Sequence, residues 1–305
     1  MDSTAATVLI TTKNRKDELR TAVASALAQD ATPRVLVIDD ASTDGTSEMI
    51  RREFPQVRLD RVESSLGLIV QRNRGAALCD TPYLFSIDDD AAFSTPRVVS
   101  QTLAEFSNPR VGAVAIPYIN VNLDKTVHQI APTDAGVHVA ASYIGTAHAL
   151  KRDLFLRLTG YREYLFHQGE EEDYCIRMLN AGYVVRLGRS DPIHHFESPR
   201  RDLRRMDLYG RRNNVLFAWC NVPMPYLPAR ILTTSFNGIR FGFKIGRPWR
   251  MVQGLAMGYA QIFRRWSQRR PVDTQVWLLH RRITLNYAIE LSDIQMQLPP
   301  ITTGG

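Results

Sequence analysis

Three consecutive aspartates, Asp88, Asp89 and Asp90, directly follow the apolar run "YLFSI" at residues 83–87. Because alternate side chains of an extended segment share a face, Asp88 and Asp90 are predicted to point together while Asp89 points away. Such a carboxylate pair suits Mg²⁺ or Mn²⁺, which take oxygen ligands and commonly keep substrate phosphates in their shell. The pair therefore suggests a metal that bridges to a diphosphate. The alternative is a solvated turn in which an aspartate caps the next segment.

A second pair of acids, Asp39 and Asp40, follows the apolar run "RVLVI". A carboxylate at the carboxyl end of a strand can accept hydrogen bonds from a ligand. Helix capping and turn formation, which Ser42 and Thr43 also favour, are the alternative explanation for the pair.

The segment "GEEEDYCIRMLNAGY" at residues 169–183 predicts a helix whose first turn is acidic. The helix dipole favours acids there, and Asp173 precedes Arg177 by the four residues of an ordinary ion pair. Glu171 is not explained in this way, because at helical spacing it shares a face with Cys175 and other apolar residues that must pack inward. A carboxylate that leads the buried face is placed at the protein body, near a site, rather than in solvent.

The elements expected to position these acids are strands that alternate with helices. Apolar, β-branched runs at 6–12, 34–42, 57–63 and 83–87 are separated by helical patterns, which is typical of parallel βαβ units and a doubly wound sheet. Ligands bind such sheets at the carboxyl ends of the strands, where the polar residues stand. Beyond about residue 111 the short apolar runs predict some antiparallel strands.

The chain has 305 residues and 44% hydrophobic content, enough for one large core and a smaller appendage. We expect a nucleotide-binding half at 1–115, a second half of the same domain at 116–200, and a basic helical region at 201–305. Between residues 200 and 270 there are fourteen arginines and one lysine but only two aspartates, although the whole chain has a net charge of only +7. This asymmetry predicts contact with an anion: nucleic acid, lipid headgroups or a phosphorylated substrate.

Cysteine usage and hydropathy indicate the compartment. The three cysteines lack metal-ligand spacing, which indicates reduced thiols and a cytoplasmic setting. The beginning "MDSTAATVLITTKN" does not resemble a signal peptide, and no apolar run approaches the ~20 residues of a membrane-spanning helix. We expect a protein that is soluble or peripheral on the cytoplasmic face of a membrane.

Five segments occur in a specific order: "VLITTKNR", "VLVIDDASTDGT", "GLIVQRNRGAAL", "SIDDD" and "GEEEDYCIRMLNAGY". Together they resemble the family-2 glycosyltransferases, inverting enzymes of the GT-A fold, over roughly residues 5–225. The resemblance implies an α/β fold, a doubly wound mixed sheet flanked by helices, with a C-terminal helical extension. It also implies transfer of a sugar from a nucleoside-diphosphate sugar to a hydroxyl of a glycan or lipid-linked saccharide, assisted by a divalent cation, Mn²⁺ or Mg²⁺.

The resemblance implies a nucleotide pocket at the first strand ends. Thr11 and Lys13 are expected against the base and ribose, with Arg15 beside them as a further nucleotide-binding candidate. Asp40 is expected at the base edge. Arg72 and Arg74, in "QRNRGAA", are candidates to balance phosphate charge, unless they lie on a solvated helix face.

The same resemblance implies a metal shell. Asp90 is the expected metal ligand, and Asp88 is expected to meet the metal or the nucleotide. Asp89 is counted on the nucleotide side, as a neighbour that is turned away from the other two. A histidine from "DPIHHFES" is expected to complete the shell, with His194 preferred and His195 second.

For the general base, the second member of the family's Glu-Asp pair falls on Glu171, a glutamate where aspartate is commoner. Glu170 is the fallback. The segment "LYGRRNNVLFAW" matches a further family pattern, in which Arg212 and Asn213 begin a helix near the mouth of the site and face the diphosphate.

These residues suggest a single displacement. A positioned carboxylate takes the proton of the acceptor hydroxyl while the cation and nearby positive charges stabilise the departing diphosphate, so that the anomeric centre is inverted. A nucleotidyltransferase is one rival, but the loop "TTKNRKDE" after the first strand lacks the expected glycines. A non-catalytic nucleotide-sugar-binding protein is the other, and it would tolerate Glu171→Gln.

The basic region mixes arginines with Phe, Trp and Tyr. Amphipathic basic helices with aromatic residues lie in anionic membrane interfaces, which makes an anionic membrane surface a candidate partner. The alternative is that the apolar faces pack on the catalytic domain. No nucleic-acid-binding module accompanies the charges, so no nucleic-acid partner is expected. The oligomeric state is left open.

Overall fold

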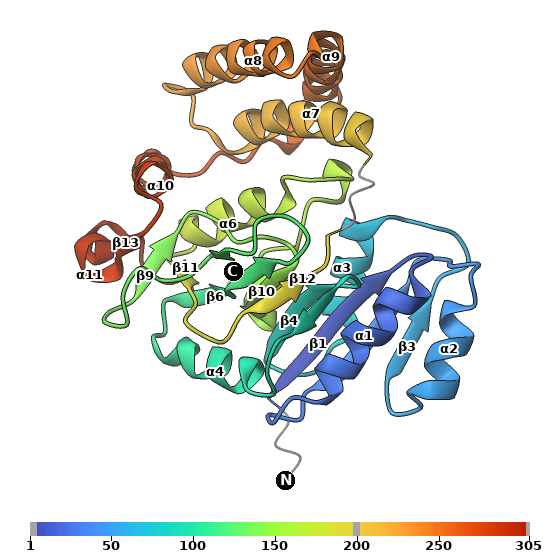
Figure 1. Cartoon of the computed structure of the whole chain (residues 1–305). Helices are drawn as coiled ribbons and strands as arrows, with labels where there is room; N and C mark the ends of the chain where they lie inside the picture. The colour runs from blue at the N-terminus through green and yellow to red at the C-terminus, as the bar shows by residue number, and fades with distance from the viewer. Residues whose placement is uncertain (1–4, 198–201, 303–305) are drawn as a thin grey trace.

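The computed structural model describes residues 5–197 and 202–302, and Figure 1 shows a large sheet flanked by helices beneath a tier of further helices. The main sheet has nine strands in the order β13-β9-β11-β6-β10-β4-β1-β2-β3. No helix within the described ranges is both long enough and apolar enough to cross a bilayer.

The first half of the sheet is parallel. It contains β1 (Ala6–Thr12), β2 (Arg34–Asp39), β3 (Arg58–Arg61) and β4 (Tyr83–Asp88), paired in the order β3-β2-β1-β4. The crossover helices are α1 (Lys16–Leu27), α2 (Thr46–Glu53) and α3 (Leu68–Leu78). The predicted doubly wound arrangement is confirmed.

The central strands are buried on both faces, which explains their continuous apolar sequences. In β1, Val8 and Ile10 enter one core cluster while Leu9 enters the other. Helix α3 approaches β1 so closely that a Cβ added at Gly75 would lie 2.3 Å from Leu9 Cδ1. The glycine of "QRNRGAAL" is therefore required by the packing of α3 on the sheet.

The second half of the sheet is mixed, as its sequence predicted. Strand β10 (Ala147–Lys151) is antiparallel to both β4 and β6 (Val111–Ala115), and β11 (Val184–Leu187) is parallel to β6. Strands β9 (His138–Ala140) and β13 (Ile289–Glu290) complete the edge. Three helices belong to this half: α4 (Val98–Ala104), α5 (Arg152–Arg157) and α6 (Glu170–Asn180).

A second, four-stranded sheet has the order β5-β12-β7-β8. Its strands are β5 (Ala91–Phe93), β7 (Tyr118–Asn120), β8 (Val127–His128) and β12 (Ile193–His195). Strand β5 begins immediately after Asp90, and its antiparallel pairing with β12 sets His195 opposite Ala91. This small sheet therefore brings a late segment of the chain to the end of β4.

The C-terminal part contains α7 (Leu203–Asn221), α8 (Leu227–Lys244), α9 (Pro248–Arg264), α10 (Thr274–Asn286) and α11 (Leu291–Ile294). Helices α7, α8 and α9 pack on one another and form the upper tier in Figure 1. The chain then returns to the main body, because α10 packs against α6 and β13 joins the edge of the main sheet. Short 3₁₀ turns occupy Glu105–Ser107, Glu163–Leu165, Trp266–Gln268 and Gln295–Gln297.

Candidate active site

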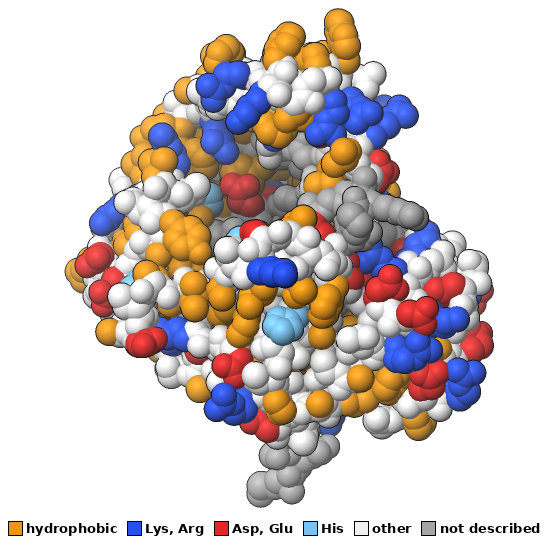
Figure 2. Space-filling model, viewed as in Figure 1, with side chains coloured by type: hydrophobic (Ala, Val, Ile, Leu, Met, Phe, Trp, Pro, Cys, Tyr) orange, Lys and Arg blue, Asp and Glu red, His pale blue; other side chains and the backbone are white. Residues whose placement is uncertain are grey.

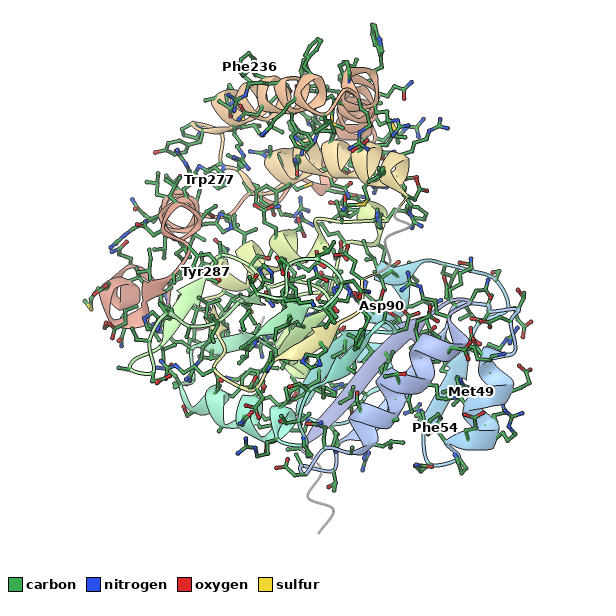
Figure 3. The ribbon with its side chains drawn as sticks, in the orientation of Figure 1. Met49, Phe54, Asp90, Phe236, Trp277 and Tyr287 are labelled. Carbon is green, nitrogen blue, oxygen red and sulfur yellow. The ribbon has the colours of Figure 1, made fainter. Side chains whose placement is uncertain are left out.

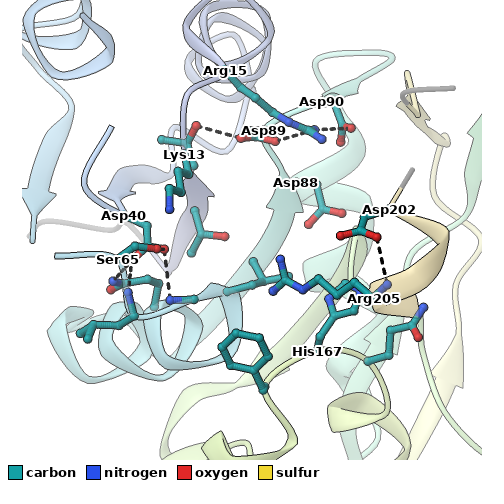
Figure 4. Close-up of a pocket in the computed structure, with 18 of the residues that line it drawn as sticks. Lys13, Arg15, Asp40, Ser65, Asp88, Asp89, Asp90, His167, Asp202 and Arg205 are labelled. Atoms are coloured by element: carbon teal, nitrogen blue, oxygen red, sulfur yellow. Dashed lines mark hydrogen bonds and ion pairs between the residues drawn. The ribbon is translucent and has the colours of Figure 1, made fainter. Parts of the chain in front are cut away.

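A cavity of about 660 Å³ lies at the carboxyl ends of β1, β2 and β4 (Figure 4). It brings together eight residues singled out in the sequence: Thr11, Lys13, Arg15, Asp40, Asp88, Asp89, Asp90 and His195. These residues come from segments far apart in the chain, and they meet because parallel strands deliver their ends to one edge of the sheet.

Asp40 stands at one side of this cavity and is almost fully buried. Its carboxylate accepts hydrogen bonds from Ser65 Oγ at 2.6 Å, from the Leu66 and Gly67 N–H groups at 2.8 and 3.1 Å, and from Gln71 Nε2 at 2.6 Å. Burial opposes ionisation, but these hydrogen bonds outweigh it and lower the pKa of Asp40. Each oxygen already accepts two hydrogen bonds, so Asp40 first of all shapes the 65–67 loop that lines the cavity.

At the other side, Asp88, Asp90 and His195 offer ligand atoms that all lie within 4.8 Å of one another. His195 Nε2 lies 3.2 Å from Asp90 Oδ1. Burial opposes ionisation of Asp90, yet the hydrogen bond and charge of His195, together with Arg15, lower its pKa. Two carboxylates and an imidazole suit Mn²⁺ or Mg²⁺, and the buried Nδ1 of His195 has no hydrogen-bond partner among the described residues. The residues present therefore fit a divalent cation.

His195 belongs to this group and His194 does not, which reverses the preference drawn from the sequence. Successive residues of a strand point to opposite faces, so only one of the two histidines can face Asp90. The His194 ring instead lies edge-on to Phe196, with ring centroids 6.4 Å apart. The pairing of β12 with β5 decides the choice.

Asp89 is not part of the group formed by Asp88, Asp90 and His195, but it still lines the cavity. It accepts hydrogen bonds from Thr12 Oγ1 at 2.8 Å and from Arg15 Nη1 at 3.1 Å. Burial, which the neighbouring acids reinforce, raises the pKa of Asp89 to about 7. Arg15 also lies 2.6 Å from Asp90 Oδ2, so its guanidinium neutralises part of the acidic cluster (Figure 4).

Arg72 is buried, so it does not lie on a solvated helix face, and it is not among the residues that line the cavity. Its guanidinium is buried and lies 2.8 Å from Asp88, 3.2 Å from Glu170 and 3.5 Å from Glu171. It also donates to the Gly145 carbonyl at 3.1 Å. Burial opposes its charge, but these acids raise the pKa of Arg72 above its ordinary value. Arg72 therefore links the candidate metal carboxylate to the candidate base.

Glu170 and Glu171 begin α6, and neither is among the residues that line the cavity. Burial and the repulsion between the two carboxylates raise the pKa of Glu171, and burial raises that of Glu170. The Glu171 side chain keeps 19% of its surface exposed, whereas Glu170 keeps 3%. Glu171 is therefore the more accessible of the two candidate bases.

Arg212 and Asn213 were predicted to lie beside the diphosphate, but they are not among the residues that line the cavity. Asn213 Nδ2 donates to the carbonyls of Leu165, His167 and Gln168 at 2.9, 2.8 and 2.6 Å. Arg212 Nη2 donates to Leu165 and to a neighbouring carbonyl. Their donors are used to hold the loop before α6.

That loop supplies cavity residues that the sequence analysis missed: Phe166, His167 and Gln168. Phe166 and Gln168 have positive φ values of 60° and 66°, a strained conformation that the bonds from α7 hold in place. The first turn of α7 adds Asp202, Arg205 and Met206. The Arg205 guanidinium lies 5.0 Å from the centre of the Phe166 ring.

Little in the sequence could have identified these residues. The Asp202 carboxylate accepts a hydrogen bond from the Arg205 N–H at 3.0 Å. This N-cap could be predicted from the segment "RDLRR". The cap predicts where α7 starts, but not that this end of α7 faces the aspartates.

Sequence comparisons agree with this geometry. The sequence profile described as Glycosyl transferase family 2 matches residues 7–161. The chain is 29% identical over 224 residues to the pre-mycofactocin glycosyltransferase of Mycobacterium tuberculosis, covering 67% of this chain and 46% of that protein. It is 33% identical over 94 residues to the succinoglycan biosynthesis protein ExoU of Rhizobium meliloti, covering 30% of this chain and 28% of that protein. The chain thus spans less than half the length of these curated relatives.

Solved structures show the same fold. The mannosyltransferase PcManGT from Pyrobaculum calidifontis, in complex with GDP-Man and Mn²⁺, superposes with a TM-score of 0.58 at 18% identity, covering 96% of this chain and 84% of that one. TarS of S. aureus in complex with UDP-GlcNAc has a TM-score of 0.59 at 13% identity, covering 96% and 81%. With half of the sequence matched by one profile and the GT-A architecture around the aspartates, the chain belongs to glycosyl transferase family 2.

Proposed function

We propose that the protein transfers a sugar from a nucleoside-diphosphate sugar to a hydroxyl of a glycan or lipid-linked saccharide, with inversion at the anomeric carbon. The observation that carries the proposal is the grouping of Asp88, Asp90 and His195 within 4.8 Å, at the edge of the same cavity that Asp40 and the 65–67 loop border. One side of the cavity suits a nucleoside and the other a metal-bound diphosphate. The named relatives are a pre-mycofactocin glycosyltransferase and a succinoglycan biosynthesis protein; the first supports sugar transfer, and the second supports a glycan as the acceptor.

On the donor side, Thr11 and Lys13 at the end of β1 are the proposed contacts to base and ribose, together with the backbone of the 65–67 loop. A divalent cation held by Asp88, Asp90 and His195 would offset the negative charge that develops on the leaving diphosphate. Arg15 pairs with Asp89 and Asp90, and it would move toward the diphosphate oxygens once a cation is bound by the cluster.

On the acceptor side, Glu171 is the proposed general base, with Glu170 behind it. An acceptor hydroxyl is a poor nucleophile at neutral pH, and a carboxylate of raised pKa takes its proton efficiently as the new bond forms. The proton ends on the carboxylate while the bond from the anomeric carbon to the diphosphate oxygen breaks. One in-line step of this kind inverts the anomeric centre and needs no covalent nucleophile.

The compartment we propose is the cytoplasm. Cys79, Cys175 and Cys220 are buried free thiols, which fits a reducing environment better than an oxidising one.

The test is a thermal-shift screen of UDP-, dTDP- and GDP-sugars with and without Mn²⁺, followed by measurement of nucleoside-diphosphate release from any donor that binds. We expect one nucleotide series to stabilise the protein, and Mn²⁺ to increase the shift. Asp90→Ala should remove the Mn²⁺-dependent shift and the release together.

The matched control is Asp153→Ala, because this acid is 82% exposed and lies outside the cavity. Release that is unaffected by chelation would refute the role of the metal, and donor binding without any release would indicate a non-catalytic binding protein.

A further inference from the structure

Helix α8 carries large apolar side chains on the side that faces away from the protein. Leu232, Phe236, Ile239 and Phe243 follow one another at three- or four-residue intervals and therefore form one stripe along the helix. They are 69%, 67%, 37% and 70% exposed. Figure 3 shows Phe236 pointing outward from the tip of the molecule.

Helix α9 repeats this arrangement. Trp249, Val252 and Phe263 recur on one side of the helix and are 78%, 39% and 79% exposed, and Trp266 just beyond its end is 63% exposed. Isolated exposed apolar residues are ordinary, but two adjacent helices with aligned aromatic stripes form a patch that marks an interaction site. We call the outward stripes of α8 and α9, with Trp266, the α8–α9 face.

The inner sides of the two helices explain why this face stays outside. A Cβ added at Gly254 would lie 2.6 Å from the Leu208 carbonyl oxygen, and one at Gly258 would lie 2.7 Å from Val215 Cβ. In α8, a Cβ at Gly242 would meet Met251 at 2.7 Å. Glycines let the helices pack tightly on α7 and on each other, so rotation to bury the aromatic stripes would cost this packing.

The charge around the face is predominantly positive, although Asp207 of α7 pairs with Arg247 and Arg250 at 3.0 and 3.5 Å. From residue 208 to residue 272 there are eleven lysines and arginines and no aspartate or glutamate. Arg240, Lys244 and Arg264 are exposed on the same two helices. Figure 2 shows hydrophobic side chains projecting from the end of the molecule formed by α8 and α9, with lysine and arginine side chains grouped just beneath them. Aromatic tips with a cationic belt behind them match the depth profile of an anionic lipid surface.

We propose that the α8–α9 face docks on an anionic lipid surface, with its aromatic side chains in the interface and its basic side chains at the headgroups. A second copy of the chain is a poor occupant, because it would bring the same positive charge to the contact. The contact is peripheral, since no helix within residues 5–197 and 202–302 qualifies as a membrane span.

Docking would also orient the candidate active site. Helix α7, on which α8 and α9 pack, contributes Asp202, Arg205 and Met206 to the cavity from its first turn. The cavity would then lie near the lipid surface, where a lipid-linked saccharide presents its hydroxyls. This last consequence rests on the proposed function, whereas the docking itself does not.

The test is co-sedimentation of the intact chain with vesicles of phosphatidylcholine alone or mixed with phosphatidylglycerol, at low and high salt. We expect binding to the mixed vesicles only, weakened by salt. The variant Phe236→Ser/Phe243→Ser should lower the partition coefficient about tenfold or more, because it removes two exposed aromatic side chains from the interface. Arg240→Gln/Lys244→Gln should lower it by about fivefold for each charge removed.

The matched control is Leu285→Ser, because Leu285 on α10 is 79% exposed but lies away from the face, and it should bind like the parent protein. All variants should keep the parent melting temperature and the donor-dependent thermal shift, which separates loss of docking from loss of the sugar site. Equal binding to neutral vesicles, or binding unchanged in the Phe236→Ser/Phe243→Ser variant, would overturn the proposal. A dimer in sedimentation velocity that this variant dissociates would assign the face to a second copy instead.

Discussion

Arg72 is the residue on which the buried charges of the site depend. The Arg72 guanidinium forms ion pairs with Asp88 of β4 and with Glu170 and Glu171 of α6, and its side chain is almost completely buried. The positive charge of Arg72 offsets the repulsion among these three carboxylates. The proposed metal ligand Asp88 and the proposed general base Glu171 can therefore lie close together. Removing the Arg72 charge would leave uncompensated carboxylates in a low-dielectric environment.

Arg72→Met is therefore expected to lower the free energy of unfolding by about 3 kcal/mol or more near neutral pH. The loss should shrink in acid, because the raised pKa values of Glu170 and Glu171 mean that both carboxyls become neutral as the pH falls. Denaturant titrations at acidic and neutral pH measure both effects. Arg74→Met is the control, since Arg74 is 42% exposed and its pair with Asp60 should contribute about 1 kcal/mol at most. An equal loss at both pH values would contradict the buried-charge explanation.

At Glu171, substitution separates chemistry from binding. Glu171→Gln keeps the size of the side chain but removes the base, so turnover should fall by about 10²- to 10⁴-fold while donor affinity changes little. Turnover assays and donor thermal shifts give the two quantities. Glu172→Gln, on the same helix but outside the contacts of Arg72, is the control and should keep most of the activity. If Glu171→Gln instead abolished donor binding, Glu171 would belong to the donor site.

The raised pKa of Glu171 also predicts a pH dependence. Burial and the repulsion of Glu170 keep the carboxyl protonated to higher pH than an ordinary glutamate, and only the ionised form can accept a proton. The value of kcat/KM should therefore rise as the pH increases through the neutral range, and this rise should disappear in Glu171→Gln. A profile that is already flat in weak acid would show that another group is the base.

At the scale of elements, the strand register decides which groups meet. Strand β5 begins directly after Asp90, and its pairing with β12 places His195 opposite Ala91. The Phe196 N–H donates to the Asp90 carbonyl at 2.8 Å, which fixes the same register from the other side. A slip of one residue would exchange the two histidines between the faces of the small sheet.

The register makes the two histidines a matched pair for mutation. His195→Ala should raise the Mn²⁺ concentration needed for half-maximal donor stabilisation by about tenfold, since it removes one of three ligand groups. His194→Ala should leave that concentration nearly unchanged. The measurement is a Mn²⁺ titration of the thermal shift at fixed donor, and a larger effect at His194 would contradict the assignment.

Helix α7 joins the site to the rest of the C-terminal part. Asn213 and Arg212 hold the 164–168 loop through its carbonyls, and Asp202 and Arg205 at the start of the helix line the cavity. The same helix carries α8 and α9. A change in the position of α7 would therefore alter the lining of the cavity in two places: at the 164–168 loop and at the first turn of α7.

At the scale of the whole molecule, the C-terminal segment is part of the main fold. Helix α10 packs against α6, which carries the two glutamates, and β13 adds a strand beyond β9. Trp277 of α10 is only 2% exposed and points into the protein (Figure 3). The helical tier, the return segment and the sheet should therefore unfold together.

Trp277→Ala tests this cooperativity. Truncating a buried tryptophan should lower the free energy of unfolding by about 3–5 kcal/mol in a single transition. Circular dichroism and tryptophan fluorescence should follow the same denaturant curve. Leu285→Ala on the same helix is the control, since Leu285 is 79% exposed and its truncation should cost little. A separate early transition that spares the sheet would show that the C-terminal segment unfolds alone.

The strands and the acids at their carboxyl ends could be predicted from the amino-acid sequence. Residues 6–12 form β1 with the predicted limits, and the apolar run before Asp88 forms β4, because continuous apolar runs can only be satisfied by burial between two layers of helices. The five motifs identified the family because each lies at the end of a strand or the start of a helix. At such places the local sequence predicts where the residues stand in the fold.

The tertiary structure alone decided the partners of each polar side chain. Whether His194 or His195 faces Asp90 depends on the register between β5 and β12, and the contacts of Arg72, Arg212 and Asn213 depend on segments distant in the chain. A long polar side chain can reach several partners, and only the packed fold selects among them. The packed fold also decides which sides of α8 and α9 face outward. The glycines allow their own sides of these helices to pack closely on neighbouring helices, which leaves the aromatic sides exposed.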